Sequence, residues 1–188
     1  VQPLIISFSP GAGLRNVDRH TPLSITFQAG LDHHAIERGL TIDPPISGTL
    51  RWQGRTLTFT PDRNWQPDQA YRITVKYRDQ ILPCCASWAF TTRPFARRIS
   101  PKEYSKANWN DPIQIAFGEA MDHASVEAAF SLHPEMRGTF YWQDNTLTFK
   151  PLIEWAEGTH YVVTLAASLQ IAQGEQPLEF DKHLYFTT

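Results

Sequence analysis

Hydrophobic and polar residues alternate in short runs along most of the chain. Every second residue is apolar in the runs 23–27, 71–77, 113–117 and 184–186. A period of two is typical of strands with one buried face. Turn residues separate the runs, with a strand about every 8–12 residues. This spacing predicts roughly seven short strands in each half of the chain, and it favours antiparallel β-sandwiches over a parallel sheet with helical crossovers.

The pattern occurs twice, with a shift of 90 positions between the copies. The shift superimposes identical residues: Phe27 on Phe117, Asp32-His33 on Asp122-His123, Trp52-Gln53 on Trp142-Gln143, Trp65 on Trp155 and Tyr71 on Tyr161. A repeat of this length indicates two copies of one domain. The sequence therefore predicts an all-β protein with two tandem antiparallel sandwiches, a domain over residues 1–93 and a second domain over residues 94–188.

One segment in each copy favours a short helix inside this β pattern. Asp32 and Asp122 are good N-cap residues, and apolar residues follow each of them at helical spacing. We expect one short helical insertion in each sandwich. The segment 93–98, which contains Pro94 and Phe95, is predicted to be a short, stiff linker that restricts the arrangement of the domains.

Composition excludes several classes of protein. The formal net charge of −2 is too close to neutral to indicate a nucleic-acid partner. No apolar run approaches the roughly 18–20 residues that a membrane-spanning helix needs, so no transmembrane segment is expected. The only cysteines, Cys84 and Cys85, are adjacent and cannot bridge distant strands, and the sequence leaves their redox state open.

The recurring Asp-His pair is the most conspicuous candidate for chemistry. Asp32, His33 and His34 could form a metal-binding or acid–base group, since carboxylates and imidazoles are common zinc ligands. The alternative is that Asp32 caps a helix and His33 faces solvent, which we favour. Nucleophile, phosphate-loop and His-Glu-x-x-His motifs do not occur in the sequence, so we expect no catalytic residues, no enzyme activity and no cofactor.

The aromatic residues divide into those that recur and those that do not. The recurring tryptophans are expected in or beside the cores, and Tyr71 and Tyr161 have the setting of a tyrosine corner. Trp88 and Trp109 do not recur, so they are the candidates for exposed binding platforms. Trp88 alternates with Phe90, which favours burial, whereas Trp109 lies in a polar loop.

Each copy resembles the bacterial Ig-like domains of the S-layer-protein type. The residues that carry the resemblance form an ordered series in the first copy: Ser9-Pro10, Ile25-Thr26-Phe27, Leu31-Asp32, Ile42-Asp43-Pro44, Gly48-Thr49, Leu57-Thr58-Phe59-Thr60-Pro61, Ala70-Tyr71 and Phe90-Thr91-Thr92. The second copy repeats most of it, including Met121-Asp122-His123-Ala124-Ser125-Val126, which is typical of the family. The resemblance covers almost the whole chain.

This resemblance implies an extracytoplasmic module without catalytic residues, in the cell envelope, the periplasm or a secreted protein. The leading hypothesis is a spacer or protein-interaction unit of a larger bacterial cell-envelope or secreted protein. Its partners would be other domains of the same protein or other envelope proteins, and exposed edge strands could accept a partner strand. The first alternative is a carbohydrate- or peptide-binding module that uses exposed aromatic residues. The second is a metal-dependent enzyme or sensor.

Overall fold

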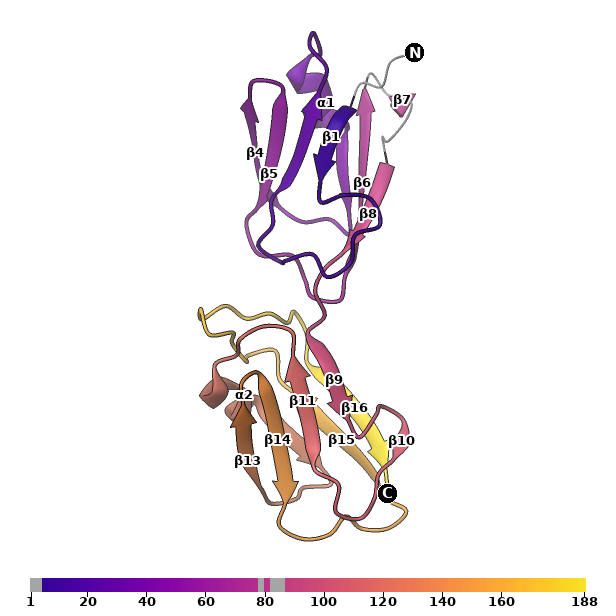
Figure 1. The fold of residues 1–188 in the computed structure, drawn as a ribbon, viewed down its shortest axis with the longest axis vertical. Helices are drawn as coiled ribbons and strands as arrows, with labels where there is room; N and C mark the ends of the chain where they lie inside the picture. The colour runs from indigo at the N-terminus through magenta and orange to yellow at the C-terminus, as the bar shows by residue number, and fades with distance from the viewer. Residues whose placement is uncertain (1–4, 78–79, 82–86) are drawn as a thin grey trace. The chain divides into compact units, whose positions relative to one another are not determined.

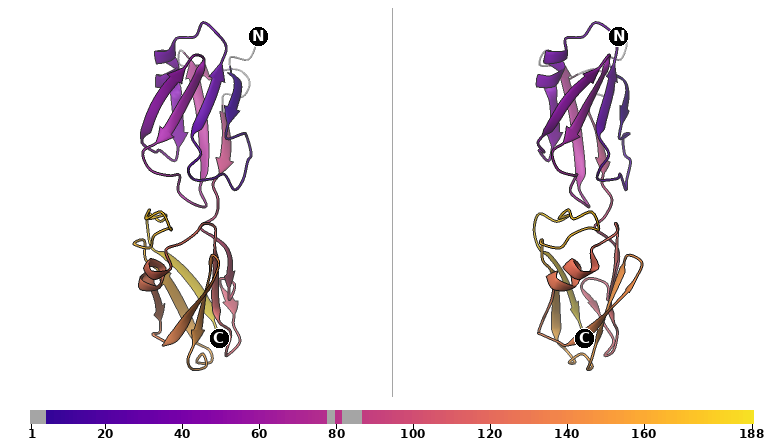
Figure 2. Two further views of the ribbon diagram at one scale, coloured as in Figure 1. Left: turned by 60° about the vertical axis from the view of Figure 1, so that its left-hand side comes forward. Right: turned by 90° about the vertical axis from the view of Figure 1, so that its left-hand side faces the viewer.

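The computed structural model describes residues 5–77, 80–81 and 87–188. The chain divides into two compact units, Val1–Arg93 and Pro94–Thr188. Each unit consists of two facing layers of strands and one short helix, as the ribbon shows in three orientations (Figures 1 and 2). The prediction of an all-β fold with a helical insertion in each copy is confirmed.

The first unit contains eight strands and one helix among its described residues. They are β1 (Ile5–Ser9), β2 (Leu23–Phe27), α1 (His33–Gly39), β3 (Leu40–Asp43), β4 (Gly48–Gln53), β5 (Thr56–Pro61), β6 (Ala70–Tyr77), β7 (Gln80–Ile81) and β8 (Ser87–Thr91). One sheet has the order β1-β2-β5-β4, and the other has the order β3-β6-β7 with β8 paired to β6. All pairs of strands in this unit are antiparallel.

The second unit repeats this plan. Its elements are β9 (Ala96–Ser100), β10 (Ser105–Lys106), β11 (Ile113–Phe117), α2 (His123–Ala129), β12 (Phe130–His133), β13 (Gly138–Gln143), β14 (Thr146–Pro151), β15 (His160–Leu165) and β16 (Lys182–Thr187). The sheets have the orders β9-β11-β14-β13 and β10-β16-β15-β12. The two-residue strand β10 pairs with β16 in parallel, which the antiparallel prediction did not include.

Each unit has its own hydrophobic core between its two sheets. The alternating apolar residues of the strands form this core, because every second side chain of β2, β5, β6 and their equivalents points inward. Large rings fill much of the space: Phe27, Trp65, Tyr71 and Phe90 in the first unit, and Phe117, Trp155, Tyr161 and Phe186 in the second. Each aromatic side chain can bury roughly 150–250 Å², which suits a small sandwich without disulfides.

The first strand departs from its predicted pattern. Apolar residues at every second position of the first segment, Leu4, Ile6 and Phe8, predict one buried face, but Leu4 lies outside the described residues and Ile6 is exposed. The register between β1 and β2 shifts between Ile5 and Ser7. This irregularity places Ile5 in the core and Ile6 outside, because one extra residue reverses the alternation.

The predicted linker is also shorter than expected. Phe95 is buried in the second core, where its ring packs edge-on against Phe117 at 5.4 Å. Strand β9 begins at Ala96, directly after it. Residues 95–98 are therefore part of the second unit. Cys84 and Cys85 lie outside the described residues.

Candidate functional site

The three predicted metal candidates at the start of α1 serve separate structural contacts. The Asp32 carboxylate caps the helix by accepting hydrogen bonds from the backbone N–H groups of His34 and Ala35, at 3.0 and 3.4 Å. The His33 ring stacks on Trp52, with 3.7 Å between centroids and 5° between planes. Nδ1 of His34 lies 3.4 Å from Oε2 of Glu37. The side chains therefore do not converge on one point, and within the described ranges no group of three metal-ligating side chains does.

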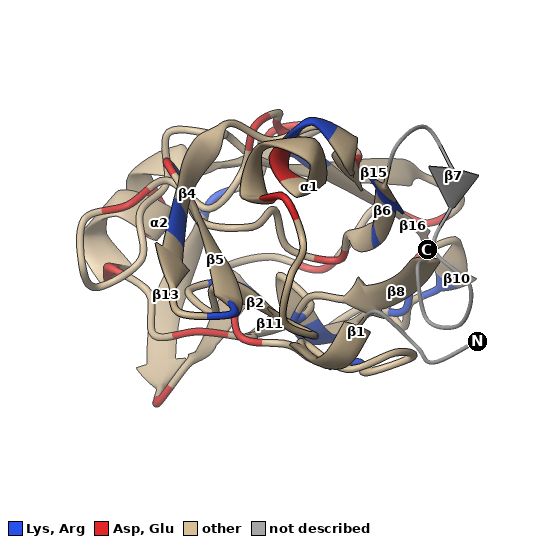
Figure 3. Ribbon diagram, turned by 90° about the horizontal axis from the view of Figure 1, so that it is seen from above, with Lys and Arg blue, Asp and Glu red and all other residues tan. Residues whose placement is uncertain are grey.

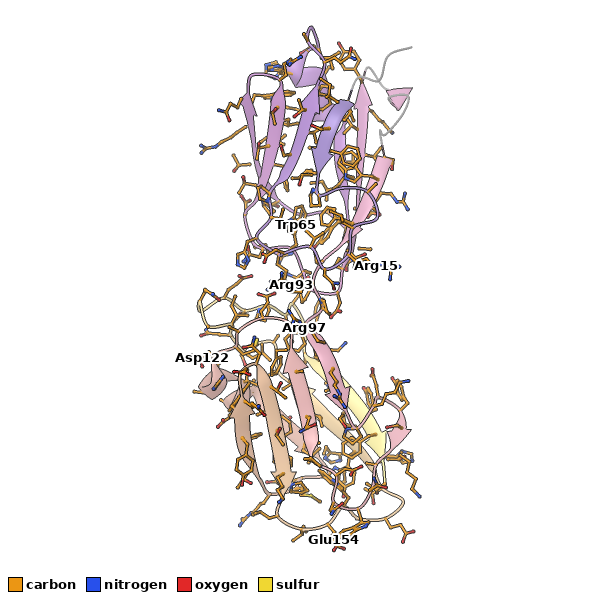
Figure 4. All side chains as sticks on the ribbon, viewed as in Figure 1. Arg15, Trp65, Arg93, Arg97, Asp122 and Glu154 are labelled. Carbon is orange, nitrogen blue, oxygen red and sulfur yellow. The ribbon has the colours of Figure 1, made fainter. Side chains whose placement is uncertain are left out.

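The same contacts recur in the second unit. The Asp122 carboxylate accepts a hydrogen bond from the Ser125 N–H at 2.7 Å, and the His123 ring stacks on Trp142 at 3.9 Å and 3°. Figure 4 shows Asp122 at the beginning of α2. The expected helix caps are confirmed in both copies. The expectation that His33 simply faces solvent was incomplete, because one face of its ring lies on Trp52.

A glutamate that sequence reasoning overlooked completes this arrangement. The indole N–H of Trp52 donates to Glu37 at 2.7 Å, and that of Trp142 donates to Glu127 at 2.8 Å. Glu37 and Glu127 also correspond under the shift of 90 positions, so the signal was present in the sequence. We call each set of Asp, His, Glu and Trp a helix-anchoring cluster, since it fixes the helix against β4 or β13.

The other recurring aromatic residues also have structural partners. The hydroxyl oxygen of Tyr71 accepts a hydrogen bond from the Gln66 N–H at 3.1 Å, and that of Tyr161 accepts one from the Ala156 N–H at 3.1 Å. The predicted tyrosine corners are therefore present. The buried indoles of Trp65 and Trp155 donate to backbone carbonyls at 2.7 and 2.8 Å. These hydrogen bonds join the recurring aromatic side chains to the backbone of their own unit.

The two predicted binding platforms differ in exposure. Trp88 is only 4% exposed, and its indole N–H donates to the Pro10 carbonyl at 3.0 Å. The structure thus places Trp88 in the core, as its alternation with Phe90 favoured, and its ring is not an exposed platform. Trp109 is 58% exposed. Its carbonyl accepts a hydrogen bond from the Trp155 N–H at 2.9 Å, so its backbone is held in place while its ring faces solvent.

Two surface hollows border β13 in the second unit. The inner hollow, of about 770 Å³, opens between the edge strands β12 and β13; its lining includes Phe130, Leu132, Met136, Gly138, Phe140 and Phe149. The outer hollow, of about 860 Å³, lies on the opposite face of the sheet; its lining includes Asn110, Tyr141, Thr148, Lys150, Ile153 and Glu154. Leu152 borders both hollows. Glu154, labelled in Figure 4, marks the loop after β14.

The outer surface near this hollow is apolar only in the second unit. Trp109, Tyr141, Leu152 and Ile153 are between 56% and 70% exposed. At the equivalent positions the first unit has the exposed residues Arg51, Asp62 and Arg63, and Arg19, which is buried. The shared fold therefore does not require an apolar surface at this place.

The pKa of the Asp18 carboxyl is lowered by its surroundings. The backbone N–H of His20 donates to its carboxylate at 2.9 Å and lowers the pKa of Asp18 below its ordinary value. Burial opposes this effect, while the His20 ring at 3.0 Å and Arg93 at 3.5 Å lower the pKa further. The contact with Arg93 joins the loop before β2 to the end of the first unit. Asn108 occupies the equivalent position in the second unit.

Comparison with known families agrees with this duplicated architecture. The model of the bacterial Ig-like domain matches residues 1–92 and again residues 90–188. The chain belongs to the bacterial Ig-like domain family. This is a family of non-catalytic domains, and bacterial Ig-like domains are generally modules of larger bacterial surface proteins. No helix in the described part of these two Ig-like domains is long and apolar enough to cross a bilayer.

Solved structures with similar folds include two L,D-transpeptidases. The enzyme from Mycobacterium smegmatis has a TM-score of 0.41 and 14% identity, over 74% of this chain and 59% of that chain. L,D-transpeptidase 3 from Mycobacterium tuberculosis has a TM-score of 0.40 and 20% identity, over 76% and 55% of the two chains.

A third similar structure is SGBP-B of a mixed-linkage glucan utilization locus from Bacteroides ovatus, in complex with a heptasaccharide. It has a TM-score of 0.31 and 14% identity, over 96% of this chain and 44% of that chain. The Ig-like chain thus spans between 44% and 59% of the length of these three proteins. Because these TM-scores are low, the similarities do not indicate a function for this chain. No curated protein matches the chain in sequence.

Proposed function

We propose that the chain is a non-catalytic spacer or protein-interaction module of a larger bacterial cell-envelope or secreted protein. The observation that supports this proposal is that the recurring polar and aromatic residues make structural contacts within their own unit. In both copies the Asp caps a helix, the His and Glu bind the hairpin tryptophan, and the Tyr forms a corner. Duplicated side chains that all maintain the fold favour a module selected for its shape.

The family supports an extracytoplasmic location, since bacterial Ig-like domains typically occur in surface or extracellular proteins. We propose the S-layer type within this family, on the ordered residues that both copies share. The partners we propose are other domains of the same protein or other envelope proteins. Interspersed basic and acidic positions along both units (Figure 3) agree with a surface that does not attract nucleic acid.

Replacement of the chain in its natural protein tests this proposal. An unrelated pair of Ig-like domains of matched length should preserve the parent protein's function if the chain acts as a spacer. The same replacement should abolish that function if the chain contacts a partner. Antibodies against the chain should label intact cells or the envelope fraction. Confinement of the chain to the cytoplasm, or deletion of both domains without any effect, would contradict the proposal.

Trp109 supports a second candidate function, the binding of a saccharide. Its ring is 58% exposed, and two hydrogen bonds from Asn108 to Asp111 close the loop around it, at 2.9 and 3.0 Å. A fixed, exposed indole can stack on the apolar face of a sugar ring. Titration with cell-wall fragments should quench tryptophan fluorescence in the natural chain and not in Trp109→Ala. No response at millimolar fragment concentrations would contradict this function.

A further inference from the structure

Strand β13 presents a free edge. It pairs with β14 on one side, and it is the last strand of its sheet. The Arg137 carbonyl accepts a hydrogen bond from the Leu152 N–H at 3.0 Å, and bonded positions alternate along an antiparallel pair. The N–H and C=O groups of Gly138 and Phe140 therefore point away from β14. They are available to a further strand.

This edge lacks the features that usually prevent strand addition. Natural edge strands are commonly protected by charged residues or proline. Strand β13 has the sequence Gly-Thr-Phe-Tyr-Trp-Gln, without either. The equivalent strand β4 carries Arg51 where β13 carries Tyr141. Figure 3 shows this difference, since β4 has a blue position and β13 does not.

Only the inner hollow lies at this free edge, between β12 and β13, whereas the outer hollow lies over β13 and β14, with Thr148 and Lys150 of β14 in its lining. Phe140 points toward the inner hollow, and Tyr141, the next residue, borders the outer one. Gly138 leaves room on the inner side for the Phe149 ring, which would lie 2.2 Å from a Cβ atom at this position. Residues of an added strand also point alternately to the two faces of the sheet. Every second side chain of an extended segment paired with β13 would therefore face the inner hollow.

The lining residues indicate which side chains fit. The rings of Phe130, Phe140 and Phe149 surround the inner hollow with centroids 5.1 to 5.3 Å apart, and Met136 adds a flexible apolar side chain. A large aliphatic or aromatic side chain suits this surface. The outer hollow, which combines Tyr141 and Ile153 with charged groups, lies over the paired side of β13 and is not part of this groove.

We propose that β13 binds an extended segment of another polypeptide as an additional strand. Backbone hydrogen bonds at Gly138 and Phe140 would hold the segment, and the inner hollow would select a large apolar side chain. The inference rests on the proposed function as a protein-interaction module and names the class of partner. The equivalent groove of the first unit is about 500 Å³, and Leu40 and Leu50 replace Phe130 and Phe140. Arg51 replaces Tyr141 on the outer face. The site therefore belongs to the second unit.

Selection from a random octapeptide library on the purified chain tests the proposal. Enriched peptides should carry large apolar residues at alternate positions. The best peptide is then synthesised in two forms, each methylated on alternate backbone nitrogens. One form should bind about tenfold more weakly than the other, because only one set of amides faces β13. Failure to enrich any peptide, or equal affinities of the two forms, would overturn the proposal.

Variants taken from the first unit locate the site. Tyr141→Arg combined with Leu152→Asp introduces the residues that the first unit has at these positions, so the fold should tolerate them. This variant should bind the peptide about tenfold more weakly, as expected for central interface residues. Arg51→Ala is the matched control and should change the affinity by less than about twofold. An unchanged affinity in the double variant, or an equal loss in Arg51→Ala, would overturn the assignment to β13.

These outcomes separate the inference from the proposed function. If the peptide selection fails while the domain replacement abolishes the parent protein's function, the chain is an interaction module that uses another surface. If the replacement preserves that function and the peptide still binds as predicted, the edge is competent for binding although the spacer role is sufficient in the cell.

Discussion

Strands β4 and β13 occupy the same place in the two units but differ on one face. Their inward-facing residues are similar, with Gly48, Leu50 and Trp52 in β4 and Gly138, Phe140 and Trp142 in β13. On the outer face, Arg51 is replaced by Tyr141. The loops after the neighbouring strands β5 and β14 differ in the same sense, from Asp62-Arg63 to Leu152-Ile153. Packing constrains the inner face, whereas the outer face differs between two units that have the same fold.

The helix-anchoring clusters show the opposite behaviour. The Trp–Glu hydrogen bonds differ by only 0.1 Å between the units, 2.7 against 2.8 Å, and both His–Trp pairs are stacked. Residues that hold the fold thus keep their geometry in both copies. Matched substitutions of such residues should therefore destabilise the two units by similar amounts. Matched substitutions on the outer faces of β4 and β13 should differ in their effect on peptide binding.

The largest expected effect is loss of a core tryptophan. Trp65→Ala and Trp155→Ala should each destabilise their own unit by about 3–5 kcal/mol, because each removes a buried ring and leaves a cavity. Chemical denaturation of the separate units measures this loss. Trp109→Ala, at an exposed position, is the control and should change stability by less than about 0.5 kcal/mol. A large loss in one unit alone would show that the two cores are not equivalent.

A smaller loss is expected at the glycine of each edge strand. A Cβ at Gly48 or Gly138 would lie 2.4 or 2.2 Å from the ring of Phe59 or Phe149. Substitution of either glycine by alanine should cost about 1–3 kcal/mol through overpacking. Gly11→Ala is the control, since its Cβ would meet nothing closer than 3.6 Å. Wild-type stability of either edge variant would indicate that the phenylalanine ring and the neighbouring backbone carbonyl of Thr60 or Lys150 can move to make room for the added methyl group.

Helix capping should contribute still less. Asp32→Ala and Asp122→Ala should each lower the free energy of unfolding by about 1 kcal/mol, because each removes the cap from exposed backbone N–H groups. The matched variants Asp32→Asn and Asp122→Asn retain an accepting oxygen and should stay close to wild type. Thermal denaturation of each unit gives the comparison. An equal loss in the Asn variants would attribute the effect to charge and not to the cap.

The smallest effect concerns a contact that only the first unit has. The lowered pKa of Asp18 means that its stabilising contribution is present above the ordinary carboxyl pKa and is lost as the pH falls through the folded-state value. Asp18→Asn, which introduces the residue that the second unit has, should lower stability at pH 7 by about 0.5 kcal/mol. The difference should disappear in acid. A difference that persists at a pH where the Asp18 carboxyl is protonated in the folded state would exclude the carboxylate charge as its cause.

Alternation and the internal repeat predicted the fold because burial imposes both patterns directly. The strands, the Asp caps and the tyrosine corners all followed from residue spacing. The inversion at Ile6 could not be predicted, since a shift in strand register leaves no mark in composition. Phe95 was assigned to a linker because its partner Phe117 is distant in sequence.

The candidate site was less predictable. The exposure of Trp109 followed from its polar neighbours, and burial of Trp88 was favoured by its alternation with Phe90. The hollows beside β13 combine residues from several strands and loops. Only the folded sandwich shows that Phe130 and Phe149, from different sheets, line the same hollow. The same holds for Leu152, which borders both hollows.

Amide hydrogen exchange during peptide binding tests the central claim most directly. The selected peptide should slow exchange at the amides of Gly138 and Phe140, which point away from β14. The equivalent amides of Gly48 and Leu50 in the first unit should exchange at an unchanged rate. Protection of the first unit's edge, or of neither edge when the peptide is bound, would contradict the claim that the two strands differ in function.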